Sequence, residues 1–169
     1  LFSFAALTDL LCASTGRSKM MQQAPGFTLT DSEGGSVSLK DLLGARLVVF
    51  FYPAAMTPGC TTEACDFRDD YGTFTDAGYR IIGISPDSPE RNQAFRDKHD
   101  LQFPLLSDPN HVVADAFGAW GTKKNYGREY EGLIRSTFVI DADGTLLLEL
   151  RNVRAKGHVA RVKRLLDLD

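Results

Sequence analysis

The run LVVFFY at residues 47–52 limits what this chain can fold into more than any other feature of its sequence. Six consecutive apolar residues, all but Leu47 β-branched or aromatic, predict a strand that is buried on both faces of a sheet. A second, mostly apolar run, YRIIGI, occupies residues 79–84. Residues 58–77 and 88–99 follow the two runs and begin with the proline and serine signals of helix starts. Strands that alternate with helices predict parallel pairing.

The remaining segments predict a sheet that ends in an antiparallel hairpin. Two further strands are expected at residues 136–140 and 145–150, because the sequence DADG between them is a hairpin signal. A last amphipathic helix carries an apolar face made of Val159, Val162, Leu165 and Leu166. Shorter elements are expected elsewhere: extended pieces at 26–30 and 37–39, a helical turn at 40–43 and a helix at 111–117.

The expected order is therefore β-α-β-α, a long connection, and then β-β-α. That order predicts an α/β protein with the thioredoxin-like fold, in which helices flank a central mixed sheet. The chain of 169 residues, with 43% hydrophobic and 24% charged residues, fits one globular domain. We expect that domain over residues 20–169. Residues 1–19, which include Cys12, are interpreted as an N-terminal extension or a cloning remnant.

Charge and cysteine content argue against several classes of function. A net charge of −3 gives no support to binding of nucleic acid or of an acidic membrane surface. The sequence has no apolar run long enough to span a bilayer. Three cysteines are too few for a disulfide-stapled secreted scaffold, and we expect a cytoplasmic protein.

The residues with the most chemistry lie where the first buried strand gives way to a helix, in the sequence PAAMTPGCTTEAC at 53–65. A cysteine in the first turn of a helix faces unsatisfied N–H groups and the positive end of the dipole, which both favour the thiolate. The thiolate is the nucleophilic form, so Cys60 is a candidate nucleophile. Thr57 places a hydroxyl within reach of this sulfur, so we expect it to hydrogen-bond to the sulfur and to an oxygen of a bound substrate. The acidic Glu63 and Asp66 would slightly oppose ionisation of Cys60, so we expect a basic residue from elsewhere to outweigh them.

Cys65 follows Cys60 by five residues. On a helix that spacing gives about 7.5 Å of rise and about 140° of rotation, so the Cα atoms would lie roughly 8–9 Å apart. A disulfide needs a separation below about 7 Å. A Cys60–Cys65 disulfide would therefore require the first turns of the helix to unwind. From spacing alone, Cys65 could equally be a buried helix residue.

The pattern Pro53-x-x-x-Thr57-x-x-Cys60 resembles the peroxidatic motif of the peroxiredoxins. Cys65 is similar to the second cysteine of the peroxiredoxin Q branch, also called bacterioferritin comigratory proteins. The resemblance extends over about residues 24–166, and residues 152–159 are similar to actinobacterial members. Further matching stretches lie at residues 50–53, 64–69, 83–87, 103–108 and 134–141.

The resemblance implies a thiol peroxidase and gives each matching residue a role. Cys60 would be the peroxidatic cysteine and Cys65 the resolving one. Arg135 falls where the family carries its active-site arginine, and would supply the positive charge expected above. Thr57 would be a further catalytic residue, against which the peroxide binds. The substrate pocket would be formed by Pro53, Pro58 and Gly59.

The same resemblance implies the reaction and its partners. Hydrogen peroxide and organic hydroperoxides would oxidise Cys60 to a sulfenic acid, and Cys65 would then form an intramolecular disulfide with it. Thioredoxin or a similar dithiol would reduce that disulfide. No metal, haem or flavin is expected, and the protein would be a monomer or a weak dimer.

Two other functions remain open at this stage. A thioredoxin-like disulfide reductase would normally carry C-x-x-C, whereas four residues separate the cysteines here. A non-enzymatic redox sensor could report oxidation through unwinding of the helix. Metal chemistry is not indicated, because His99, His111 and His158 are scattered and lack metal-ligand spacing from any cysteine.

Overall fold

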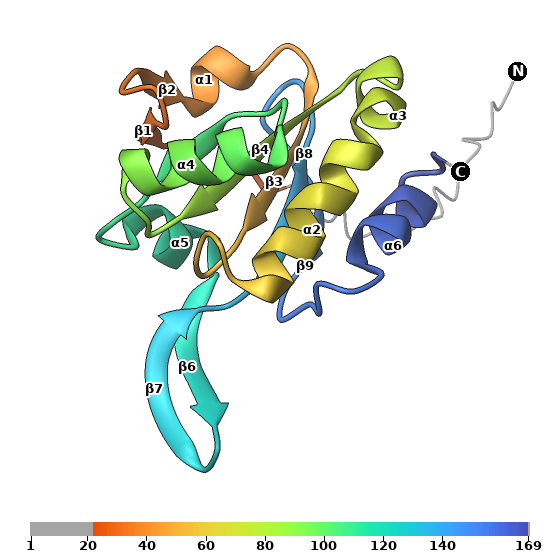
Figure 1. Ribbon diagram of the computed structural model, residues 1–169. Coiled ribbons are helices and arrows are strands. Elements are labelled where there is room, and N and C mark those ends of the chain that lie inside the picture. The colour runs from red at the N-terminus through yellow and green to blue at the C-terminus, as the bar shows by residue number, and fades with distance from the viewer. Residues whose placement is uncertain (1–21, 169) are drawn as a thin grey trace, which may run out of the picture.

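The computed structural model describes residues 22–168, so the expectations for residues 1–19 and Cys12 lie outside it (Figure 1). The strands are β1 (Thr28–Asp31), β2 (Ser36–Ser38), β3 (Arg46–Phe51), β4 (Tyr79–Ser85), β5 (Leu105–Ser107), β6 (Trp120–Asn125), β7 (Arg128–Leu133), β8 (Ser136–Ile140) and β9 (Leu146–Leu150). The helices are α1 (Leu39–Leu42), α2 (Pro58–Asp69), α3 (Tyr71–Asp76), α4 (Pro89–His99), α5 (Val112–Phe117) and α6 (His158–Leu165).

Seven strands form a mixed central sheet in the order β2-β1-β5-β4-β3-β8-β9. The three central strands β3, β4 and β5 run parallel to one another, which confirms the expectation drawn from the buried runs. Strand β8 pairs antiparallel with β3, and β9 pairs antiparallel with β8. The predicted hairpin at 141–144 therefore closes this side of the sheet, and the α/β thioredoxin-like architecture is confirmed.

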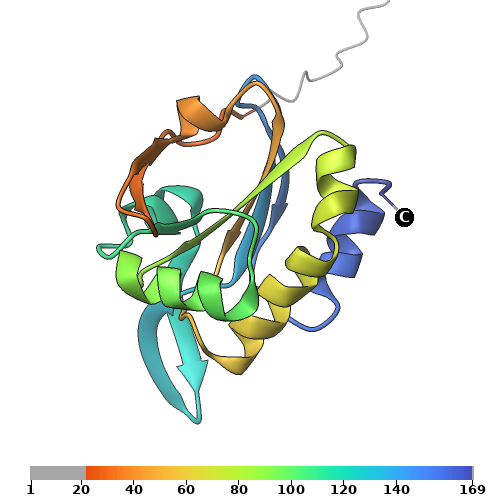
Figure 2. The same cartoon turned by 45° about the horizontal axis from the view of Figure 1, so that its top comes forward.

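Helices lie on both faces of the central sheet (Figure 2), and strand β3 contributes side chains to a hydrophobic core on each face. Val48 and Phe50 pack into a cluster that includes side chains of α2, α3, α4 and α6. Leu47, Val49 and Phe51 face the opposite way, into a cluster with side chains of α1 and α5. All five side chains have no exposed surface, as predicted for a strand covered on both faces.

One expected helix is two helices. The predicted segment 58–77 is interrupted at Asp70, which lies between the end of α2 and the start of α3. The backbone of Asp70, with φ −97° and ψ 7°, departs from helical geometry. The hydrophobic pattern does not reveal the break, because Phe67 and Phe74 on either side of it are both fully buried in the same core. In α6, Val159 and Val162 are buried as expected, but Leu165 is half exposed at the end of the helix.

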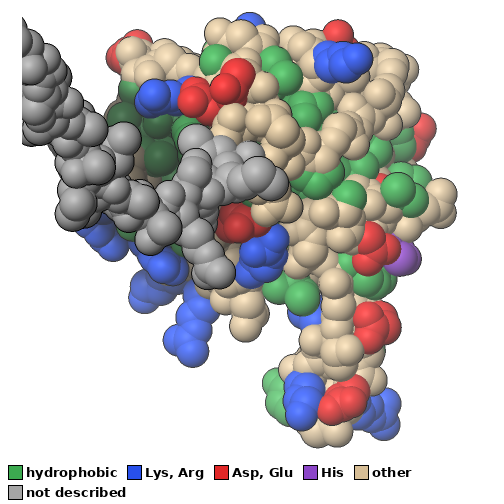
Figure 3. Space-filling view, turned by 180° about the vertical axis from the view of Figure 1, so that it is seen from behind, with side chains coloured by type: hydrophobic (Ala, Val, Ile, Leu, Met, Phe, Trp, Pro, Cys, Tyr) green, Lys and Arg blue, Asp and Glu red, His purple; other side chains and the backbone are tan. Residues whose placement is uncertain are grey.

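The expected long connection contains three strands. The short β5 lies inside the central sheet, whereas β6 and β7 form a separate two-stranded hairpin. This hairpin projects from the body of the protein (Figure 1) and carries charged side chains of both signs near its tip (Figure 3). Its turn uses Tyr126 at φ 49° and Gly127 at φ 76°, the positive values typical of a tight hairpin. The strands are mostly exposed, so they lack the alternating pattern that predicts a half-buried strand.

No helix in the part of the chain that the structure describes is both long and apolar enough to cross a lipid bilayer.

Candidate active site

The loop between β3 and α2 carries the predicted motif and is fixed by the next strand-to-helix connection. The backbone N–H of Ala55 donates to Asp87 Oδ2 at 2.6 Å, and Arg91 Nη2 donates to the Ala55 carbonyl at 3.1 Å. Asp87 and Arg91 also form an ion pair at 3.1 Å. The same loop holds Met56 at a positive φ of 67°, a conformation that costs energy and persists only where the surroundings enforce it.

Cys60 lies in the first turn of α2, where the sequence placed it. Pro58 is the first helical residue, and the Cys60 side chain is only 1% exposed. Because the first N–H groups of a helix have no acceptor inside it, the amides of Gly59 and Cys60 point toward any anion held at this end. The segment thus combines a thiol with backbone donors.

The Thr57 hydroxyl is oriented differently from the sequence expectation. Its Oγ1 lies 2.7 Å from the carbonyl oxygen of Ala54. A carbonyl can only accept, so the hydroxyl proton belongs to this bond, and Thr57 offers lone pairs rather than a hydrogen to a neighbouring group. Thr57 can therefore accept a hydrogen bond from a bound peroxide, but it has no second proton to donate to the sulfur.

Arg135 connects the start of β8 to the catalytic helix. Its Nη2 lies 3.2 Å from Cys60 Sγ, and its Nη1 donates to Glu63 Oε1 at 3.0 Å. Gly59 makes this approach feasible, because a Cβ at that position would lie 3.2 Å from Arg135 Nη2. The structure therefore places the Arg135 guanidinium group within hydrogen-bonding distance of the Cys60 sulfur.

Glu63 is a fully buried member of this cluster, which the sequence did not reveal. Burial raises the pKa of Glu63 to about 7, against the opposing effect of the Arg135 charge. Its second oxygen, Oε2, has no hydrogen-bond partner among the described residues and lies 4.0 Å from His158 Nε2. His158 is also buried, with Nε2 2.7 Å from Thr137 Oγ1. Burial lowers the pKa of His158 to about 4, so its ring is neutral at pH 7.

We expect the Glu63→Gln variant to change how stability depends on pH. The folded-state pKa of Glu63 is raised, so the folded protein keeps this proton to higher pH than the unfolded chain does. The associated stability is complete below pH 4.5 and is lost as the pH rises to about 7. Across that window the unfolding free energy of the wild type should fall relative to the variant, by at most about 1.4 kcal/mol per pH unit.

Urea unfolding under reducing conditions at several pH values between 5 and 8 measures this difference. Subtracting the variant from the wild type removes the opposite contribution of His158, whose lowered pKa makes stability rise with pH. Glu90→Gln, an exposed carboxylate at the start of α4, is the matched control and should run parallel to the wild type. A constant difference between wild type and Glu63→Gln would show that Arg135 keeps Glu63 ionised throughout.

A pocket of about 440 Å³ opens beside this cluster, lined on one side by Pro53 and Arg135 and on the other by the hairpin residue Lys123. Lys123 Nζ donates to the Leu133 carbonyl at 2.8 Å, which holds the lysine across the hairpin. Burial and the nearby Arg135 charge lower the pKa of Lys123. A larger cavity, about 630 Å³, lies near Phe27, and neither Arg135 nor Pro53 belongs to its lining. The pocket next to Arg135 is therefore the one suited to a small polar substrate.

Cys65 lies in the same helix as Cys60, and both are free thiols. The helical geometry assumed from the sequence therefore holds between them, and a disulfide requires the first turns of α2 to open. Cys65 is partly buried, and burial raises the pKa of its thiol above the ordinary value. The region 22–168 contains no group of three or more His, Cys, Asp or Glu side chains arranged to hold a metal ion.

Comparison with known proteins decides the family. Residues 20–148 match the model of the AhpC/TSA family. The chain belongs to this family. It is 56% identical over 142 residues to the putative peroxiredoxin Rv2521 of Mycobacterium tuberculosis, an alignment that covers 84% of this chain and 90% of the relative. Peroxiredoxin Bcp of Bacillus subtilis is 51% identical over 139 residues, with coverage of 82% and 88%.

Solved structures agree with this family membership. The bacterioferritin comigratory protein of Xanthomonas campestris, studied for its alkyl peroxide reduction activity, superposes with a TM-score of 0.79 at 35% identity. The match covers 83% of this chain and 90% of that one. This peroxiredoxin is accordingly a thiol-dependent peroxidase, an enzyme that takes a hydroperoxide as substrate and a thiol as reductant.

The structure thus gathers five of the predicted residues at one place: Pro53, Thr57, Gly59, Cys60 and Arg135. Three contributors were not predicted in these roles, namely Glu63, Asp87 and His158. Asp87 lies inside the stretch 83–87 that resembles the family. That resemblance did not indicate the contact of Asp87 with the loop at Ala55. Glu63 and His158 are charged or titratable types that are usually exposed, so only the folded structure reveals their burial.

Proposed function

We propose that this peroxiredoxin reduces hydrogen peroxide and organic hydroperoxides at Cys60 and forms an intramolecular disulfide with Cys65. The observation that carries the proposal is the 3.2 Å contact between Arg135 Nη2 and Cys60 Sγ beside an open pocket. A guanidinium group in this position stabilises the thiolate and then the negative charge that develops on the peroxide oxygens. The alkyl peroxide activity of the Xanthomonas relative supports the inclusion of organic substrates.

Each neighbouring residue has a defined part in the first step. The peroxide lies between Arg135 and the helix start, where the amide of Cys60 and the guanidinium donate to its oxygens. The Thr57 hydroxyl donates its hydrogen bond to the Ala54 carbonyl, so its oxygen accepts a hydrogen bond from the peroxide O–H and orients the peroxide. Cys60 Sγ attacks one oxygen, the O–O bond breaks, and water or an alcohol leaves. Pro53 covers one wall of the pocket and limits access of bulk water.

The second step regenerates the enzyme. The first turns of α2 open, Cys65 attacks the sulfenic sulfur of Cys60, and water is released as the disulfide forms. A thioredoxin-like dithiol then reduces the disulfide by exchange. We further propose that the protein works in the cytoplasm as a monomer or weak dimer. Three cysteines are too few for a disulfide-stapled secreted protein. The net charge of −3 gives no support to a nucleic-acid or membrane partner.

The Cys65→Ser variant tests the second step. We expect it to consume one equivalent of peroxide at the wild-type rate, because the contacts of Cys60 are unchanged. Steady-state turnover with thioredoxin and its reductase should then fall at least about 100-fold, because no disulfide is available for exchange. Cys12→Ser is the matched control and should keep full turnover. Mass spectrometry of the wild type after one equivalent of peroxide should show a Cys60–Cys65 linkage. Full turnover of Cys65→Ser would remove Cys65 from the mechanism.

A further inference from the structure

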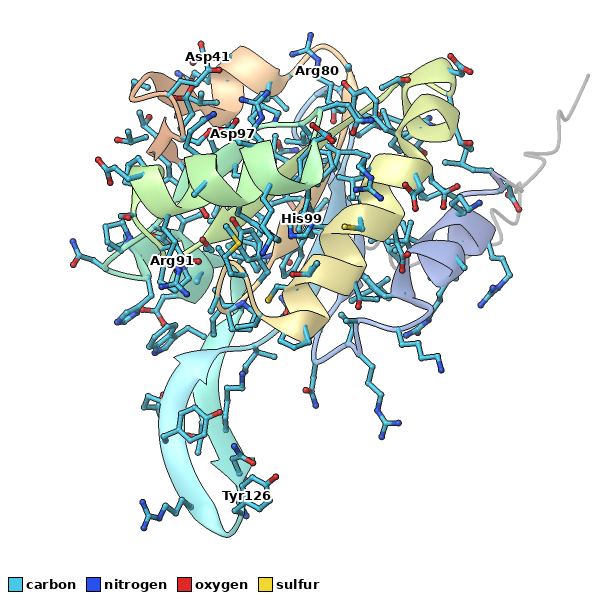
Figure 4. The ribbon with its side chains drawn as sticks, viewed as in Figure 1. Asp41, Arg80, Arg91, Asp97, His99 and Tyr126 are labelled. Carbon is cyan, nitrogen blue, oxygen red and sulfur yellow. The ribbon has the colours of Figure 1, made fainter. Side chains whose placement is uncertain are left out.

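The second cysteine has a histidine neighbour that the steps above do not use. Cys65 Sγ lies 3.8 Å from His99 Nδ1, within hydrogen-bonding distance for sulfur. His99 is the last residue of α4, and its side chain lies between α4 and α2 (Figure 4). The two residues are 34 positions apart in the chain, so the contact depends on how the two helices pack.

Several contacts hold the His99 imidazole in this place. Arg68, one helical turn after Cys65, donates from Nη1 to the His99 carbonyl at 2.9 Å. Phe95 packs edge-on against the imidazole with ring centroids 5.3 Å apart. Residues three apart on a helix share a face, so Cys65 and Arg68 both face His99. Contacts to the backbone of His99 and to its ring therefore position the imidazole.

The thiol of Cys65 needs help to ionise. Burial raises its pKa, the carboxylates of Asp69 and Asp66 act in the same direction, and only Arg68 opposes them. The thiolate is the form that attacks a sulfenic sulfur. Near neutral pH an unassisted Cys65 would remain mostly protonated, and resolution would wait for a proton to leave.

We propose that His99 is the general base of the resolving step, accepting the Cys65 proton at Nδ1. This inference rests on the proposed role of Cys65 as the resolving cysteine. An imidazole changes its charge between pH 5 and 8, so it is the side chain best suited to remove a proton at neutral pH. The transfer takes place while α2 is folded, because the contact exists only in that arrangement.

The step balances in atoms and electrons. The S–H bond of Cys65 breaks and its proton moves to His99 Nδ1. The thiolate then forms an S–S bond with Cys60 as the S–O bond of the sulfenic acid breaks. The Cys65 sulfur is oxidised and the Cys60 sulfur is reduced by the same amount. The departing hydroxide takes up one proton and leaves as water, and the imidazolium returns its proton to solvent, since His99 is only half buried.

A single-turnover experiment tests the role of His99. Reduced protein is mixed with one equivalent of hydrogen peroxide and quenched at set times, and mass spectrometry separates sulfenic acid from disulfide. His99→Asn keeps a hydrogen-bonding atom near the Nδ1 position but cannot take up a proton. Its oxidation phase should match the wild type, whereas disulfide formation at pH 6.5–7 should slow on the order of 100-fold. Lys98→Gln, an exposed change one residue earlier, should leave both phases unchanged.

The pH profile distinguishes a base from a packing residue. The charged groups that face the pair are Asp66, Arg68 and Asp69 on α2, with Asp100 close to Arg68 just beyond α4. All of them remain in the variant. The difference in the rate of disulfide formation between wild type and His99→Asn should therefore become smaller as the pH rises, because the thiol then loses its proton to solvent. Added imidazole should accelerate resolution in His99→Ala and leave the wild type unaffected.

Two results would overturn the role of His99. One is resolution at the wild-type rate in His99→Asn near neutral pH. The other is a slow rate that neither high pH nor imidazole restores, which would mark a structural contact. Failure of the proposed function has a different signature, because Cys65→Ser would then turn over normally with thioredoxin whatever His99 does.

Discussion

Peroxide consumption is expected to disappear when Cys60 is replaced by serine. Serine has almost the shape of cysteine, so the neighbouring Arg135 should keep its place, but a hydroxyl without an adjacent general base is not ionised near neutral pH. We expect kcat/KM for hydrogen peroxide to fall by on the order of 10⁴-fold or more, since the nucleophile itself is removed. Loss of hydrogen peroxide followed in the presence of thioredoxin and its reductase measures this change.

Thermal unfolding of Cys60→Ser serves as the folding control, and the variant should unfold close to the wild type. Cys65→Ser provides a comparison within the same helix, because it should still react once with peroxide. Residual activity of Cys60→Ser above about one per cent of the wild type would mean that another group attacks the peroxide.

The second large effect is expected at Arg135. Replacement by methionine removes both the contact with Cys60 Sγ at 3.2 Å and the partner of the buried Glu63. Loss of one preorganised donor at a site of developing charge typically costs about 10²- to 10³-fold in rate. We expect the second-order rate of Cys60 oxidation to fall by that amount. Arg135→Lys should recover only part of it, because a single ammonium cannot contact both the sulfur and Glu63 as the planar fork does.

Stopped-flow mixing with hydrogen peroxide under single-turnover conditions measures the oxidation rate. The double variant Arg135→Met/Glu63→Gln separates catalysis from folding, since it removes the buried carboxylate that would otherwise lack a partner. The double variant should be more stable to unfolding than Arg135→Met, but its Cys60 should be oxidised by peroxide as slowly as in Arg135→Met. Arg154→Met, an exposed arginine in the loop after β9, is the matched control. Equal oxidation rates for wild type and Arg135→Met would exclude the guanidinium from the first step.

Much of the fold follows from local sequence patterns. The uninterrupted apolar run at 47–52 predicted a doubly buried central strand, and the register of β3 with both β4 and β8 agrees. The hairpin β6–β7 was missed because it projects from the body, and its strands have no buried face to produce an alternating pattern. The break at Asp70 was missed because apolar residues continue at helical spacing on both sides of it.

The site was predictable as far as local chemistry defines it. The position of Cys60 follows from the strand-to-helix boundary and from Pro58, and both are properties of neighbouring residues. The need for a positive charge was also evident, but its source in Arg135 came from resemblance, since 75 residues separate it from Cys60. The role of Glu63 could not be predicted, because a carboxylate on a helix normally points to solvent. Here the fold encloses it with Arg135 and His158.

The end of α2 at Asp70 has a consequence for repeated redox cycles. Asp70 is held by Lys163 of α6 at 3.3 Å, so the boundary between α2 and α3 is attached to a second layer of the protein. Melting that begins at Pro58 meets this boundary before it reaches Phe74, whose side chain remains in the core. If loss of helical order stops at this boundary, it affects about three turns of α2 and leaves α3 in place. An enzyme built in this way can open α2 while Phe74 on α3 stays packed, which limits the apolar surface that each cycle displays and that would otherwise favour aggregation.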